Sequence, residues 1–212
     1  MLDRYARDPN LLDFATEKAR DVFPNEERPW TKCPLKKHTS SAETHLLFKL
    51  AKEGGPGNYA DVGCLFGGST ATLGHGVAAS GNSGTIYAVD YFGTGPGNDP
   101  GVASAPENIK RYFKATLPSV PVVICPGDSA TWGRRFNLEF SGVFIDAGHD
   151  YESCKADLLA WGPKVKTNGW IAFHDTNFTG VNAVVKQLDL KVWKFERQVF
   201  SIKVFRRLPN SV

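Results

Sequence analysis

Hydrophobic residues along the chain fall into short apolar runs that alternate with stretches of helical spacing. The apolar runs typical of buried strands occur at 59–62, 85–89, 120–125, 143–145 and 170–173. Helical spacing or helix-forming composition occurs at 69–79, 106–114, 129–135, 151–161 and 181–188. Strands that alternate with helices predict a parallel sheet covered by helices on both faces.

A further helix is expected before the first strand. Ser40 followed three residues later by Glu43 is a capping-box pattern, in which each residue satisfies the other's backbone N–H. Apolar residues from Leu46 to Leu50 follow at helical spacing, so this helix should run to about Lys52.

The two ends of the chain depart from the alternation. Prolines interrupt residues 1–38, which we expect to form an irregular extension or a lid, leaving 39–212 as one domain. At the other end, apolar runs at 191–195 and 199–206 are too close for a crossover helix between them. They predict an antiparallel hairpin that closes the sheet.

Composition narrows the class of protein. Of 212 residues, 42% are hydrophobic and 22% are charged, which is typical of a globular chain and excludes a disordered or coiled-coil protein. No apolar run approaches the roughly 18 residues of a membrane span, and the first residues do not resemble a secretory signal. The net charge of +3 is too small to indicate nucleic-acid binding, so neither a membrane nor a nucleic acid is an expected partner.

The four cysteines, Cys33, Cys64, Cys125 and Cys154, form no CxxC pair. A zinc cage is therefore not expected. We interpret them as reduced thiols, which indicates a cytoplasmic protein.

The first strand leads into a glycine-containing loop, Asp61-Val62-Gly63-Cys64-Leu65-Phe66-Gly67-Gly68-Ser69-Thr70. Ligands of open α/β sheets bind at this end of the strands, where a helix N-terminus offers free N–H groups. Leu65 occupies the middle glycine position of the NAD fingerprint, and the lysine of a P-loop is missing. Asp90 ends the next strand and suits ribose hydroxyls. The alternative is a tight turn that binds no ligand.

At these residues the sequence resembles a known family. The loop 61–70, followed by Val89-Asp90, resembles motif I and its successor in class I S-adenosylmethionine-dependent methyltransferases. The stretch 144–151 (FIDAGHDY), continuing to 168–175 (NGWIAFHD), is similar to small O-methyltransferases, many of which modify sugars or other hydroxylated molecules. The resemblance covers about 40–206. It implies a Rossmann-like, doubly wound, mostly parallel seven-stranded sheet with a C-terminal antiparallel hairpin, in three α/β/α layers.

The resemblance also implies a donor site. The residues at the methionine end of S-adenosylmethionine and in the turn beneath it would be Asp61, Gly63, Gly67, Gly68 and Ser69. Asp90 would bind the ribose hydroxyls, and Asp128 with Ser129 would hold the adenine ring. Asp128 and Ser129 can also form a plain helix N-cap, and the two roles can coexist. Asp146 is a further donor contact, through the amino group.

A hydroxyl acceptor must lose its proton, either to a general base or through a divalent metal. His149, three residues beyond Asp146, is the first candidate for the base, and His174 is the second. Asp146 and Asp175 end neighbouring strands and are oxygen ligands of the kind Mg²⁺ favours. Candidates for a third metal ligand are His174, Thr176 and Asn177. His45 and His75 fall inside expected helices and are interpreted as structural.

The favoured function is transfer of a methyl group from S-adenosylmethionine to a hydroxyl of a small molecule, of sugar or phenol type. The loop 91–105 and the N-terminal 38 residues are candidate lids over the acceptor. A second copy of the chain stays open as a partner. The alternatives are a non-catalytic binding module and a nucleotide-binding oxidoreductase, the latter disfavoured by Leu65.

Overall fold

The computed structural model describes residues 29–95 and 100–209. The predictions for residues 1–28, as part of an extension or lid, and for residues 96–99 of the candidate loop lid lie outside the described residues. One sheet of seven strands, in the order β3-β2-β1-β4-β5-β7-β6, forms the centre of the fold. The strands are β1 (Gly57–Val62), β2 (Gly84–Asp90), β3 (Val122–Pro126), β4 (Phe140–Ile145), β5 (Val165–Phe173), β6 (Trp193–Val199) and β7 (Ile202–Arg207).

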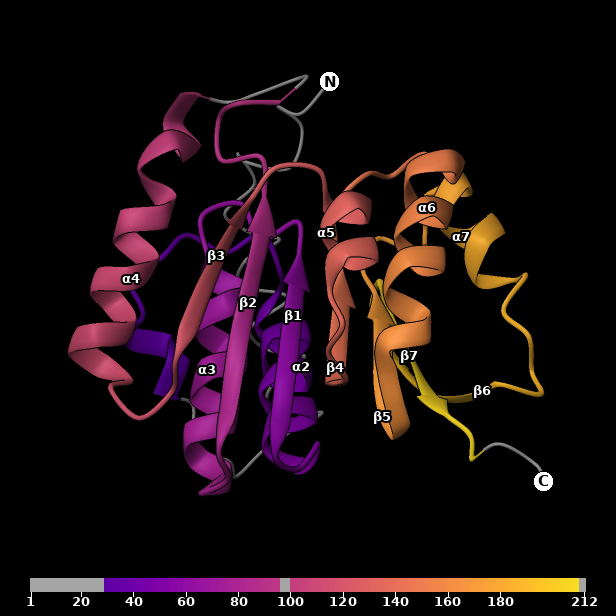
Figure 1. Cartoon of the computed structure of the whole chain (residues 1–212), viewed down its shortest axis with the longest axis horizontal. Coiled ribbons are helices and arrows are strands. Elements are labelled where there is room, and N and C mark those ends of the chain that lie inside the picture. The colour runs from indigo at the N-terminus through magenta and orange to yellow at the C-terminus, as the bar shows by residue number, and fades with distance from the viewer. Residues whose placement is uncertain (1–28, 96–99, 210–212) are drawn as a thin grey trace.

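The first five strands pair in parallel, and their carboxyl ends point to one edge of the sheet, the upper edge in Figure 1. Among the last two strands, β7 alone runs in the opposite direction, since it pairs antiparallel with both β5 and β6. The expected seven-stranded sheet with a C-terminal antiparallel hairpin is confirmed.

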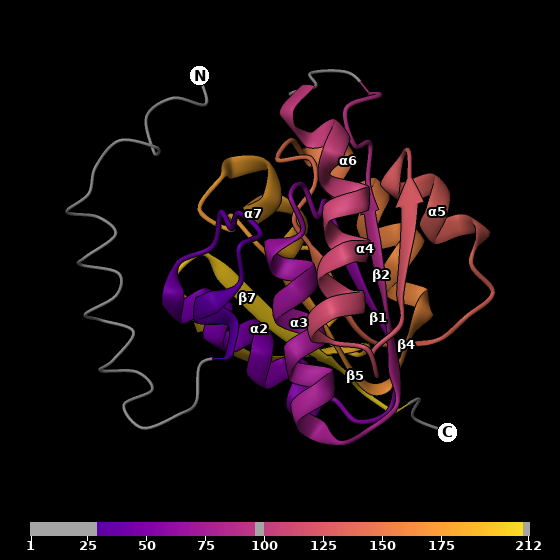
Figure 2. The same cartoon turned by 90° about the vertical axis from the view of Figure 1, so that its left-hand side faces the viewer.

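Helices cover both faces of the sheet, as the two views show (Figures 1 and 2). One face carries α2 (Ser41–Glu53), α3 (Gly68–Ser80) and α4 (Ala105–Thr116), and the other carries α5 (Ser129–Arg135), α6 (Tyr151–Trp161) and α7 (Thr179–Val185). Short 3₁₀ segments occur at Pro29–Lys32, Pro100–Ser104 and Gly162–Lys164. The three-layer arrangement is therefore also confirmed.

Each face has its own apolar core. Leu46, Leu73 and Phe113 pack under the first group of helices, and Phe140 and Trp161 pack under the second, all at most 2% exposed. Central strands buried on both faces explain why the sequence shows continuous apolar runs instead of alternation.

Several predicted boundaries were wrong at the end of the chain. The seventh strand begins at Ile202 instead of 199, because Phe200 and Ser201 form the hairpin turn. The sixth strand, which pairs with it, begins at Trp193 instead of 191, because Lys191 donates its N–H to the Asp189 side chain in a turn. The last helix spans Thr179–Val185 instead of 181–188.

All four cysteines are free thiols, as predicted. Among residues 29–95 and 100–209, helices are too short or too polar to cross a lipid bilayer.

Candidate active site

The carboxyl ends of the parallel strands are joined into one continuous edge by backbone hydrogen bonds. The N–H of Gly63 donates to Val89 O at 2.8 Å, and the N–H of Asp146 donates to Val62 O at 2.8 Å. The N–H of His174 extends the edge to Ile145 O at 3.0 Å. The residues that follow β1, β2, β4 and β5 therefore share one edge, as the sequence predicted.

Gly63 is the point at which the loop after β1 turns across β4. It has a φ of +90°, and a Cβ there would come within 2.3 Å of the backbone oxygen of Asp146. Because that obstacle is backbone, it cannot rotate away. Glycine at this position lets the loop and the end of β4 lie against each other.

Asp61 supports the loop from beneath. Its Oδ2 accepts hydrogen bonds from Ser69 Oγ at 2.8 Å and Thr70 Oγ1 at 2.5 Å, which tie the end of β1 to the first turn of α3. The side chain is fully buried, and burial raises its pKa to about 7. Asp61 and Ser69 thus belong to the turn itself.

Gly67 and Gly68 serve close packing. A Cβ on Gly67 would meet Ile109 of α4 at 2.3 Å, and one on Gly68 would meet Lys37 at 2.4 Å and the backbone oxygen of Lys36 at 2.5 Å. The start of α3 is therefore covered by residues that precede α2. Within the described part of the chain no side chain caps this helix start, so its first N–H groups can receive a carboxylate.

Asp90 connects the tip of β2 to the same loop. Its Oδ2 accepts the N–H of Leu65 at 2.9 Å, and its Oδ1 accepts the N–H of Phe92 at 3.0 Å. Each carboxylate oxygen has a second lone pair, so both can also accept a hydroxyl. These two acceptor oxygens fit a ribose diol, and the uncapped helix start fits the carboxylate of a methionine.

Asp128 and Ser129 follow β3 at the edge of the sheet. Asp128 is the N-cap of α5, because Oδ1 accepts the N–H of Thr131 at 2.7 Å, while Tyr91 donates its hydroxyl to Oδ2 at 3.2 Å. Ser129 Oγ donates to Asp157 Oδ1 at 2.6 Å. The plain N-cap is present, and contact with an adenine ring stays a prediction.

Asp146, His149 and Asp175 converge at the ends of β4 and β5. One ligand-capable atom of each lies within 4.8 Å of the others, and His149 Nε2 is 2.9 Å from Asp175 Oδ2. The hydrogen bond to Asp175 raises the pKa of His149. Burial would raise the pKa of Asp175, but hydrogen bonds from His149 and His174 hold it well below its usual range. Asp175 has a φ of +52°, an uncommon conformation that Asp tolerates.

His174 lies beneath this cluster and is 8% exposed. Its Nδ1 is 2.9 Å from Asp146 Oδ1 and 3.4 Å from Asp175 Oδ2, and its Nε2 is 3.7 Å from Glu43 Oε1. Burial alone would lower its pKa, but these three carboxylates raise it to about 12. A protonated imidazole has no lone pair for a metal or for a substrate proton.

The geometry therefore favours His149 over the three residues considered as a third metal ligand. His174 is engaged by carboxylates, and Thr176 donates its hydroxyl to Ser201 O at 2.8 Å. Asn177 is exposed. Two carboxylates and one imidazole form a donor set that a divalent metal can use.

Three further residues, Glu43, His38 and Phe66, lie at this edge without having been predicted there. Glu43 was interpreted as a helix cap alone, yet it faces His174 across the sheet edge. The His38 ring stacks on Phe66 of the glycine loop at 6.1 Å, and Lys36 Nζ lies 5.0 Å from the same ring. Burial lowers the pKa of His38, while Asp146 acts to raise it. The segment before His38 contains prolines and lysines but no recognisable motif. The sequence therefore did not indicate that His38 would lie against the glycine loop.

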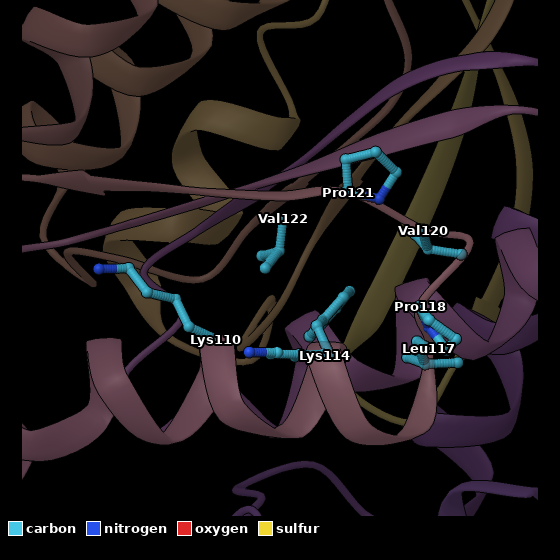
Figure 3. A pocket seen from close by; sticks show the side chains of 8 residues that line it. Lys110, Lys114, Leu117, Pro118, Val120, Pro121 and Val122 are labelled. Atoms are coloured by element: carbon cyan, nitrogen blue, oxygen red, sulfur yellow. The ribbon is translucent and has the colours of Figure 1, made fainter.

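His45 and His75 lie inside α2 and α3, where helices were expected. His75 Nε2 is 2.7 Å from the Tyr112 hydroxyl, away from the cluster. Figure 3 shows a hollow between α4 and the segment that leads into β3, lined by Lys114, Leu117, Pro121 and Val122 among others. It lies at the amino end of β3, opposite the edge described here.

Comparisons with known proteins bear on the family and the fold. A family model described as a methyltransferase domain matches residues 60–176, more than half of the chain. No curated protein sequence matches the chain.

Solved structures of methyltransferases share the fold at low sequence identity. The O-methyltransferase NovP is 16% identical, with a TM-score of 0.66 over 94% of this chain and 99% of NovP. CalS11, a TDP-rhamnose 3'-O-methyltransferase of calicheamicin biosynthesis, is 18% identical, with a TM-score of 0.58 over 94% of this chain and 95% of CalS11. An O-methyltransferase from Bacillus cereus, solved with S-adenosylhomocysteine, is 16% identical, with a TM-score of 0.59 over 97% of this chain and 94% of that enzyme.

Proposed function

The chain belongs to the methyltransferase domain family, and we propose that it transfers the methyl group of S-adenosylmethionine to a hydroxyl group of a small molecule. The supporting observation is the position of the Asp146, His149 and Asp175 cluster. It adjoins Gly63 through Asp146, and so meets the loop expected to hold the donor.

Methyl transfer is an in-line displacement, in which the acceptor oxygen bonds to the methyl carbon as the carbon–sulfur bond breaks. The protein's first task is to hold the two reactants in line. We assign the donor to the surface formed by Gly63, Asp90 and the start of α3. The acceptor hydroxyl then lies over the ends of β4 and β5.

The second task is removal of the hydroxyl proton, which we assign to His149. Its Nε2 faces Asp175 at 2.9 Å, so Nδ1 is the ring nitrogen left to accept the proton. Asp175 orients the ring and stabilises the imidazolium that forms, as a carboxylate does for histidine in other proton-transfer sites. The exposed Phe178 stacks on the His149 imidazole, with 5.1 Å between the ring centroids, and this stacking also restrains the ring.

A metal-assisted variant of this function uses the same three residues. Asp146, His149 and Asp175 would hold a divalent ion such as Mg²⁺. The ion would lower the pKa of an acceptor hydroxyl bound to it. In that case His149 is a ligand and not the base, so the two variants exclude each other and can be separated by experiment.

For the acceptor, we propose a sugar or phenol. CalS11 is described as acting on TDP-rhamnose, and NovP as an O-methyltransferase. Phe178 stacks on His149 of the cluster and Phe66 stacks on His38, and aromatic side chains of this kind can pack against a sugar or phenol ring. A cytoplasmic location and a homodimer stay predictions, and a non-catalytic binding module is the alternative function.

The test is incubation with S-adenosylmethionine carrying a labelled methyl group and a panel of phenols, sugars and nucleoside diphosphate sugars. Mass spectrometry should find a product heavier by one methyl group on oxygen. The H149Q variant should produce less than a hundredth of it. Full activity in EDTA supports His149 as the base, whereas activity lost in EDTA and restored by Mg²⁺ supports the metal variant. Absence of product from the whole panel, with no binding of the donor, contradicts the proposed function.

A further inference from the structure

A continuous line of polar contacts runs from the C-terminal hairpin to the edge of the candidate site. Ser201, in the turn between β6 and β7, donates its N–H at 3.0 Å and its hydroxyl at 2.6 Å to Glu43 Oε1. The same oxygen is 3.7 Å from His174 Nε2, and His174 Nδ1 is 2.9 Å from Asp146 Oδ1. Four elements far apart in sequence are thereby connected.

Glu43 does more than cap α2. The cap uses Oε2, which accepts the N–H and the hydroxyl of Ser40 at 2.9 and 2.8 Å. The other oxygen is directed away from the helix start, toward Ser201 and His174. Glu43 is 5% exposed, and a buried carboxylate is costly unless polar partners surround it. The partners of Oε1 therefore account for a carboxylate here.

We propose that Glu43 is a positioning residue, which contacts Nε2 of His174 and so holds Nδ1 of that ring toward Asp146. A rotation of the ring by half a turn would place carbon atoms against both Glu43 and Asp146, and the contact at Nε2 disfavours this rotation. Asp146 Oδ1 is thereby fixed. The effect on turnover rests on the proposed function, but the contacts of His174 do not.

The variant E43Q removes the carboxylate that faces His174. Because glutamine has one acceptor oxygen, it can keep the bonds from Ser40 but loses Oε1 as the acceptor of Ser201. Glutamine is the other residue that completes a capping box, so the start of α2 is retained. The charge that faces His174 is lost. E53Q is the matched control, because Glu53 is an exposed glutamate of the same helix, paired with Lys49 at 3.8 Å and distant from the site.

The first readout is the imidazole N–H signals in a ¹H–¹⁵N spectrum of the free protein, with the His174 signals identified by their loss in H174Q. The wild type and E53Q should show a slowly exchanging Nδ1–H of His174. In E43Q this signal should shift and exchange rapidly, while the melting temperature stays within a few degrees. An unchanged Nδ1–H signal in E43Q overturns the proposal.

The second readout is a double-mutant cycle on turnover of the best acceptor from the panel. E43Q should lower kcat about tenfold and leave the KM for S-adenosylmethionine within twofold. In the H174Q background the same change should have less than a twofold effect, since residues acting through one another are not additive. Equal effects in both backgrounds contradict the proposal. If the wild type methylates nothing and does not bind the donor, the proposed function fails, and the spectrum still decides the role of Glu43.

Discussion

The carboxylate of Asp90 accepts the backbone N–H of Leu65 at 2.9 Å, which joins the tip of β2 to the loop after β1. This contact links the two parts of the proposed donor site before any ligand binds. Leu65 occupies the position that argued against NAD, and its φ of +48° shows that the turn is made there without glycine.

Gly63 should tolerate no side chain. In G63A a Cβ would meet the backbone of Asp146 at 2.3 Å, so we expect a loss of several kcal/mol in the free energy of unfolding. Gly81 provides a control, because it also has a positive φ, +69°, but open space around it. G81A should lose about 1–2 kcal/mol, the cost of left-handed backbone for an L-residue. Urea unfolding of both variants compares them, and equal losses would contradict the assigned contact.

His149 and Asp175 should control the pH dependence of methyl transfer. Because the hydrogen bond to Asp175 raises the pKa of His149, the base is protonated, and activity falls, below a pH higher than the ordinary histidine value of about 6.5. The D175N variant should move this acid limb to lower pH and also reduce turnover. A pH–rate profile of both proteins measures the shift. A limb that stays in place in D175N would exclude His149 as the titrating base.

Asp61 should make the fold less stable as pH rises. Burial raises its pKa to about 7, whereas the unfolded chain titrates near 3.9. Between these values the unfolded state releases the proton that the folded state keeps, so the free energy of unfolding decreases with increasing pH. The loss from Asp61 is about 4 kcal/mol by pH 8, because about three pKa units separate the two states and each unit corresponds to about 1.4 kcal/mol.

The D61N variant keeps an oxygen for Ser69 and Thr70 but cannot ionise. It should lose less stability than the wild type between pH 5 and pH 8, and should melt at or above the wild-type temperature at pH 8. The raised pKa of His174 contributes a similar decrease in both proteins. Thermal unfolding at pH 5 and pH 8 provides the comparison. If the wild type loses no more stability than D61N between pH 5 and pH 8, then Asp61 has the same pKa in the folded and the unfolded state, which contradicts this prediction.

Local signals predicted the elements well. The capping box of Ser40 and Glu43 and the apolar runs of the central strands depend on neighbours in sequence, and both are present in the structure. The ends of β6 and β7 were harder to predict, because they depend on pairing between the two strands. Trp193 pairs with Arg207, and Val199 pairs with Ile202. The family resemblance supplied most of the candidate site residues.

The contacts among those residues could not be predicted from one sequence. Glu43 meets His174 only because α2 packs beside the end of β5, and the pair is separated by more than a hundred residues. His149 and Asp175 likewise meet because a parallel sheet brings two strand ends together. Each of these histidines was a candidate base, and burial among three carboxylates is what separates His174 from His149.

The most direct test of the account is a calorimetric titration of the protein with S-adenosylhomocysteine. The wild type should bind it, and D90A should bind at least tenfold more weakly, since a hydrogen-bonded charged group contributes about 1.5–3 kcal/mol. D189A is the matched control, because Asp189 also accepts the N–H two residues on, from Lys191 at 2.9 Å, away from the site. Its affinity should equal that of the wild type. A wild type that releases no heat and gains no thermal stability, or a D90A variant that binds equally well, would contradict the proposed donor site.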